Sequence, residues 1–178
     1  MHAEADRLKR CHKAWWLWLV LSLLPGMAFA RQGVEGTGMP APMVRQDVRV
    51  VYDVSHDDRE AGIGKALFYA RGLIAAYVSL GVPRKALDIH LVLHGAAAYW
   101  ALNEDAFQRE RGDPFAFNPN EKIIEKLIAD GVHVEVCNAS LKARGWTAED
   151  LLPGVLRVHD GYTRIIDLQL RGHAYLYF

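Results

Sequence analysis

The chain has 178 residues, with 21 lysines and arginines balanced by 21 aspartates and glutamates, and 51% of its residues are hydrophobic. This length and composition are typical of one globular domain and exclude a disordered chain. The zero net charge argues against a nucleic-acid binder, and two cysteines exclude both a disulfide-rich scaffold and a four-cysteine zinc site.

Residues 1–30 have the pattern of a cleavable secretory signal. A basic start is followed by a short apolar run at 14–24 and by the small-x-small sequence Ala28, Phe29, Ala30. A bilayer needs roughly 20 apolar residues, so we expect cleavage near Ala30, export to the periplasm and no membrane anchor afterwards. The mature chain then keeps a single cysteine, Cys137, and cannot form an intramolecular disulfide.

The rest of the chain predicts one folded domain behind a leader. Residues 31–47 are rich in glycine and proline, which is typical of a flexible leader, and the domain follows at 48–178. Short apolar and β-branched runs predict strands at 48–54, 87–93, 132–136, 155–158 and 174–178. Apolar residues at three-four spacing predict helices from Asp57 or Asp58 to about residue 80, at 120–130, near 140–143 and at 162–170.

The alternation of strands and helices fixes the expected fold class. It predicts a single three-layer α/β domain around a mostly parallel five-stranded sheet, flavodoxin-like in layout. The turn after the first strand, Ser55 to Asp58, is acidic and therefore unsuited to a flavin phosphate, so we expect no cofactor.

Histidines and the lone mature cysteine follow the predicted strands directly. His56 follows the first strand, His94 the second, Cys137 the third and His159 the fourth. Because sites in parallel sheets form at the carboxyl ends of strands, we expect these residues at one edge. Cys137 also precedes a predicted helix, whose N–H groups and dipole favour the reactive thiolate. His94 or His56 is then a candidate general base.

Two other interpretations of these residues stay open. Cys137 could be an inert buried side chain, with each histidine bonded to local backbone. His56, His94, His159 and Cys137 would also suit zinc or copper, although no close pair such as H-x-x-x-H or C-x-x-C supports a metal site, and we expect none. Three further histidines are interpreted as structural or surface positions of the strands: His90, His133 and His173.

Several segments resemble the DsrE/DsrF-like family of sulfur-relay proteins. They are V-H-V-E-V-C-N-A-S-L-K-A-R-G at 132–145, D-L-L-P-G-V at 150–155, L-Q-L-R-G-H-A-Y-L-Y at 168–177 and L-D-I-H-L-V-L-H-G at 87–95. The resemblance implies a compact DsrE-like α/β fold and a homotrimer or homohexamer. It also implies a cysteine that carries sulfur as a persulfide, matched by Cys137, and a strand-end histidine, matched by His94.

The sequence therefore predicts a sulfur carrier or transferase. Cys137 would accept sulfane sulfur from a donor protein or small sulfur compound and pass it on, with His94 or His56 assisting its deprotonation. The alternatives are a non-catalytic oligomeric binding module of the periplasm and a histidine/cysteine metal-binding protein.

Overall fold

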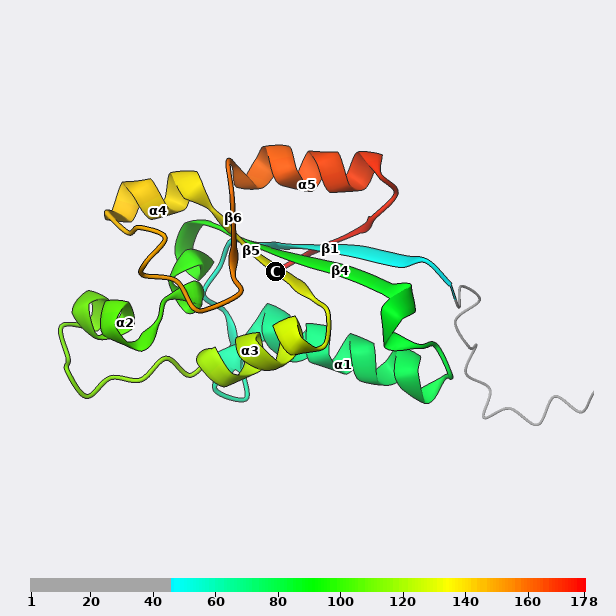
Figure 1. Cartoon of the computed structure of the whole chain (residues 1–178), viewed down its shortest axis with the longest axis horizontal. Coiled ribbons are helices and arrows are strands. Elements are labelled where there is room, and N and C mark those ends of the chain that lie inside the picture. The colour runs from blue at the N-terminus through cyan, green and yellow to red at the C-terminus, as the bar shows by residue number, and fades with distance from the viewer. Residues whose placement is uncertain (1–45) are drawn as a thin grey trace, which may run out of the picture. The chain divides into compact units, whose positions relative to one another are not determined.

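The computed structural model of the protein describes residues 46–178. These residues form a sheet between two layers of helices (Figure 1). The predicted export signal at 1–30, and the leader up to residue 45, lie outside the described residues and stay predictions. In the part of the chain that is described, no helix combines the length and apolar character needed to cross a membrane.

The main sheet has five strands, all parallel, in the order β6-β5-β4-β1-β7. This confirms the parallel α/β sheet expected from the sequence. The order reverses at β1, because β4, β5 and β6 follow on one side of it and β7 pairs on the other. In flavodoxin, by contrast, the last strand lies at the far edge beyond the fourth. The strands are β1 (Val48–Val54), β4 (Leu87–Leu93), β5 (His133–Cys137), β6 (Leu156–Val158) and β7 (Ala174–Tyr177).

Helices α1 and α3 cover one face of the sheet, and α4 and α5 lie on the other (Figure 1). The sequence did not predict α2, because only Ala106 and Phe107 of this polar helix are buried. The helices are α1 (Lys65–Ser79), α2 (Glu104–Arg111), α3 (Glu121–Ala129), α4 (Asn138–Arg144) and α5 (Gly161–Leu170), with 3-10 turns η1 (Arg84–Ala86) and η2 (Gly95–Ala101).

Helix α1 begins later than predicted. Residues 59–64 form a small antiparallel hairpin of β2 (Arg59–Glu60) and β3 (Ile63–Gly64), and the helix begins only at Lys65. The two aspartates expected to cap this helix, Asp57 and Asp58, form other hydrogen bonds. Asp57 accepts a hydrogen bond from Trp100 Nε1 at 2.7 Å, and the carbonyl of Asp58 accepts one from Lys65 N at 2.8 Å. Tertiary contacts therefore override the local capping preference of the two aspartates.

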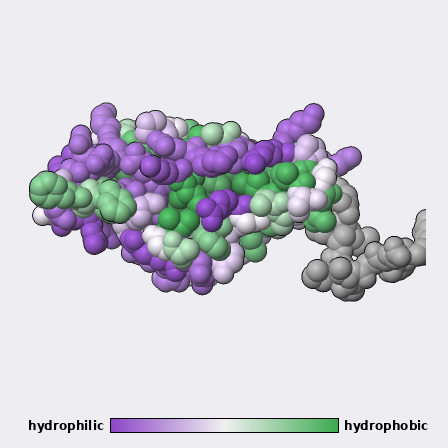
Figure 2. Space-filling model, turned by 90° about the horizontal axis from the view of Figure 1, so that it is seen from below, coloured by the Kyte–Doolittle hydropathy of each residue, from purple (hydrophilic) through white to green (hydrophobic). Residues whose placement is uncertain are grey.

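The two faces of the sheet differ in chemistry, because alternate residues of a strand point to opposite sides. The α1–α3 side carries the main core, built from buried valines, leucines, isoleucines and Tyr52. Figure 2 views the molecule from this side and shows apolar residues in a band between hydrophilic ones. The core on the α5 side is small, and ionisable residues flank it. That small core consists of Val51, Val92, Ile165 and Leu168.

Candidate functional site

Cys137 ends β5 and lies at the N-termini of two helices. It is the N-cap residue of α4, and the backbone N–H of Gly161, the first residue of α5, donates to its Sγ at 3.3 Å. An N–H donor and the positive end of a helix dipole stabilise negative charge on sulfur. Only 4% of the residue is exposed. The start of α5 therefore covers the sulfur and places a backbone donor beside it.

His94 packs against the same backbone segment as Cys137. A Cβ added at Gly161 would lie 3.3 Å from the Cβ of His94 and 3.5 Å from the Cβ of Cys137. The strand register explains this meeting: Leu93 of β4 lies opposite Val136 of β5, so the next residues of the two strands are neighbours. The structure thus brings together two of the three site residues predicted from the sequence.

His94 is one end of a hydrogen-bonded chain that runs through Asp53 to Tyr175. Its Nε2 lies 2.6 Å from Asp53 Oδ1, and the hydroxyl of Tyr175 donates to Asp53 Oδ2 at 2.6 Å. A carboxylate only accepts, so Nε2 carries the proton and Nδ1 is the basic nitrogen of the neutral ring. The bond to Asp53 raises the pKa of Tyr175 to about 12, which keeps this phenol a donor. Asp53 thus orients His94 in the way that the third residue of a catalytic triad orients the base.

The turn after His94 depends on Gly95. This residue has φ of +54°, and a Cβ there would lie 3.1 Å from the carbonyl oxygen of Ser55. Its N–H donates to Ser140 Oγ on α4 at 3.0 Å. Glycine therefore allows the end of β4 to approach β1 closely, and the bond to Ser140 joins it to the helix that follows Cys137.

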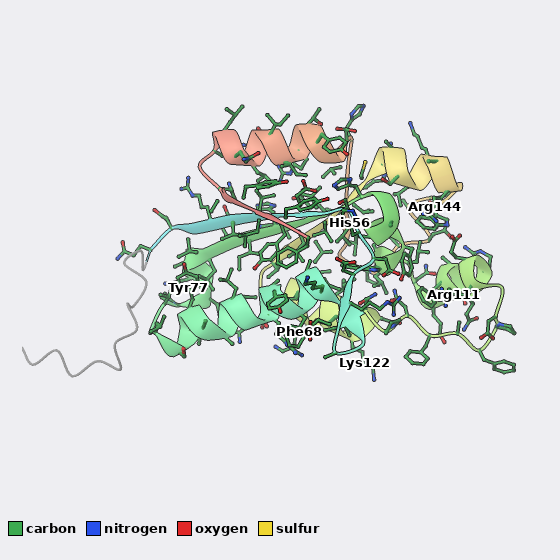
Figure 3. The ribbon with its side chains drawn as sticks, turned by 180° about the vertical axis from the view of Figure 1, so that it is seen from behind. His56, Phe68, Tyr77, Arg111, Lys122 and Arg144 are labelled. Atoms are coloured by element: carbon green, nitrogen blue, oxygen red, sulfur yellow. The ribbon has the colours of Figure 1, made fainter. Side chains whose placement is uncertain are left out.

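His56 lies apart from the His94 chain, in the turn after β1, at the carboxyl end of the sheet (Figure 3). Its Nδ1 is 3.0 Å from Ser55 Oγ and 3.2 Å from the hydroxyl of Tyr177, whose ring it meets edge-on. Among the described residues, its hydrogen bonds and ring contacts involve only these two neighbours. The structure does not join it to Cys137, and its role as a base stays a prediction.

Comparison with known proteins identifies the family. The DsrE/DsrF-like family matches residues 56–178. The chain belongs to the DsrE/DsrF-like family. This membership supports a sulfur-relay type of function at the level of the family.

Two solved structures are similar to this DsrE-like chain. One is the protein of unknown function MTH1491 from Methanobacterium thermoautotrophicum, 23% identical with a TM-score of 0.52, covering 74% of this chain and 100% of its own. The other is the ychN protein from E. coli, 20% identical with a TM-score of 0.50, covering 73% of this chain and 99% of its own. At these identities the likeness shows the fold alone. No curated protein matches the chain.

The metal ligands considered from the sequence do not form a cluster in this DsrE-like domain. Within residues 46–178, His56, His94, His159 and Cys137 do not converge as a ligand set. The ligand atoms that do converge lie at the other end of the strands, from Asp88, His90 and His133. The interpretation of a metal site at the carboxyl edge is therefore wrong for the described residues.

A cavity beside the carboxyl edge carries two guanidinium groups. Its volume is about 270 Å³, and Ala96 of η2 places it close to the turn after His94. Arg144 forms an ion pair with Glu110 at 3.2 Å, and Arg111 lies at the same end of the molecule (Figure 3). The carboxylates of Asp57 and Glu110 line the same cavity, so its charged lining is balanced.

Proposed function

We propose that this protein carries sulfane sulfur as a persulfide on Cys137. The observation that supports it most is the position of Cys137 Sγ, which accepts the Gly161 N–H at the start of α5. His94, oriented by Asp53, packs against the same glycine. A nucleophilic thiol beside an oriented base is the arrangement that sulfur transfer requires.

The proposed reaction has two steps. His94 accepts the thiol proton, and the Cys137 thiolate attacks the outer sulfur of a donor persulfide or thiosulfonate. The S–S bond of the donor breaks, the donor leaves as its anion, and a new S–S bond forms on Cys137. An acceptor thiolate then attacks the outer sulfur, and Cys137 leaves as a thiolate next to the Gly161 N–H. No external oxidant or reductant is needed.

Access to the sulfur depends on the first turn of α5. Cys137 is 4% exposed, whereas Tyr162, directly after Gly161, is 65% exposed. The ring of Tyr162 meets the His94 ring edge-on, with centroids 5.1 Å apart. A donor therefore reaches Cys137 when this turn moves.

Replacing Cys137 with serine is expected to abolish sulfur loading. Incubation of the wild type with thiosulfate or polysulfide should add the mass of one sulfur atom, removable by a thiol reductant, and intact mass analysis detects it. Cys11→Ser is the matched control, because it removes the other cysteine of the chain and should load normally. A wild type left unmodified by every donor would contradict the proposal and favour a non-catalytic binding module.

We also propose that the protein forms a homo-oligomer through the outer face of α5. Tyr162, Ile166 and Leu170 are spaced four residues apart and are 65%, 56% and 84% exposed. This spacing aligns them in one apolar stripe, which marks an interaction surface. The edge strand β7 also exposes apolar residues. Ile166 lies on this exposed face, whereas Ile165 and Leu168 of the same helix pack into the small core.

Replacing Leu170 with aspartate is expected to dissociate the oligomer. A charge in an apolar contact is desolvated without a partner, so the trimer or hexamer should shift to monomer in light scattering coupled to size exclusion. Phe115→Asp places the same charge on an exposed apolar residue of the loop between α2 and α3, outside the stripe, and should leave the mass unchanged. A monomeric wild type would refute the assembly.

A further inference from the structure

Three histidines meet one aspartate at the starts of the strands, at the end of the sheet opposite Cys137. Asp88 and His90 belong to β4, His133 begins β5, and His173 directly precedes β7. Their Nε2 atoms approach the Asp88 carboxylate at 3.0 Å for His90, 3.1 Å for His173 and 4.0 Å for His133. Three imidazole nitrogens from three segments of the chain therefore point to one carboxylate.

The other ring nitrogens of the two buried histidines have acceptors of their own. His90 Nδ1 lies 2.7 Å from Glu135 Oε1, and His173 Nδ1 lies 2.9 Å from the carbonyl oxygen of Leu168. These acceptors require a proton on Nδ1, which directs the Nε2 lone pair toward Asp88. Metal-bound histidines show this second contact, because a carboxylate or carbonyl fixes the ring and raises its basicity.

Protons alone satisfy this arrangement poorly. His90 and His173 each have acceptors on both ring nitrogens, whereas a neutral imidazole has one N–H. The rings of His90 and His173 lie with their centroids 5.2 Å apart, so their Nε2 atoms face the same carboxylate from two sides. A cation held between these atoms and Asp88 would give each Nε2 a partner while Nδ1 keeps its own acceptor.

We propose that Asp88, His90, His133 and His173 bind a divalent transition-metal ion, with Zn²⁺ as the first candidate. Three imidazole nitrogens and one carboxylate oxygen form a tetrahedral zinc donor set. Zinc bonds of about 2 Å place such ligands roughly 3.3 Å apart. His90 Nε2 lies 3.0 Å from Asp88 Oδ1, whereas His173 Nε2 lies 3.1 Å from the other oxygen, Oδ2, so His173 joins the set through a turn of the carboxylate. His133 completes the set by a small inward movement, since its ligand atom lies within 4.8 Å of those of Asp88 and His90.

Two of the four ligands are exposed, and these give the ion a route from solvent. The side chains of His90 and His173 are 8% and 3% exposed, whereas those of Asp88 and His133 are 45% and 47% exposed. Asp88 and His133 also line a cavity of about 580 Å³. The two buried histidines are thus held in place, and the two exposed ligands close over the ion. None of the four ligands is a thiol, so the site is independent of sulfur loading on Cys137.

Titration of the chelator-stripped full chain carrying Cys11→Ser with Co²⁺ and Zn²⁺ tests the site. We expect one ion per chain by calorimetry, and cobalt d–d absorption without a thiolate-to-cobalt charge-transfer band. His133→Gln and Asp88→Asn should each weaken the affinity at least about 10-fold. His159→Gln, an exposed histidine outside the cluster, and Cys137→Ser should bind as the parent does.

Three results would overturn the site. They are a charge-transfer band that Cys137→Ser removes, an affinity unchanged in both His133→Gln and Asp88→Asn, and the absence of binding to a chain whose circular dichroism is that of the folded protein.

Discussion

Replacing His94 with glutamine is expected to slow persulfide formation on Cys137 by roughly 10²–10⁴-fold, the range for loss of a general base. Glutamine can still donate to Asp53, which holds His94 Nε2 at 2.6 Å, but its amide does not accept a proton near neutral pH. The rate of sulfur loading, followed by intact mass over a range of pH, measures the effect.

The same substitution at His56 is the matched comparison. His56 also follows a strand, but its contacts among the described residues are with Ser55 and Tyr177. His56→Gln should therefore load sulfur at nearly the wild-type rate. A larger loss in His56→Gln than in His94→Gln would show that His56 is the base, and that the chain from Asp53 to His94 has only a structural role.

Strands were predicted better than helix ends. The bounds expected for β1 and β4 are those observed, because valine, leucine and isoleucine make up most of both segments and permit few alternatives. The start of α1 was misplaced, since the Asp57 side chain bonds to Trp100 and the backbone carbonyl of Asp58 closes the hairpin onto Lys65. Such partners come from distant parts of the chain or from a turn closing on itself, so local propensity cannot identify them.

The candidate site was only partly predictable for a related reason. Cys137 and His94 both follow buried strands, and this placed them at one edge. Asp53 was missed because β1 was treated as buried on both faces alike. The alternation in L-D-I-H-L-V-L-H at 87–94 and V-H-V-E-V-C at 132–137 puts the ionisable residues of both strands on one side. The strand order decides which of them meet, and it is a property of the whole fold.

That ionisable face also contains the interaction whose loss should destabilise the fold most. Glu135 on β5 is 1% exposed, and Arg164 on α5 donates to both its oxygens at 2.7 Å. Burial raises the pKa of Glu135, but the bonds from Arg164 and His90 outweigh it and hold the pKa at about 2, below its usual 4.5. The carboxylate therefore stabilises the fold fully above about pH 4.5, by an amount on the order of 3 kcal/mol, and this is lost as the pH falls toward 2.

Replacing Arg164 with methionine should lower the free energy of unfolding by about 3–5 kcal/mol at pH 7, because Glu135 then stays buried without its main partner. Urea denaturation in the presence of a chelator measures this apart from metal binding. The difference from the wild type should shrink below pH 4.5, because the wild type loses the stabilisation from its Glu135 carboxylate there. The double variant Glu135→Leu, Arg164→Met removes the unpaired charge and should recover much of the loss. If the double variant is as unstable as Arg164→Met, the loss comes from the packing of the arginine stem instead of from the buried carboxylate.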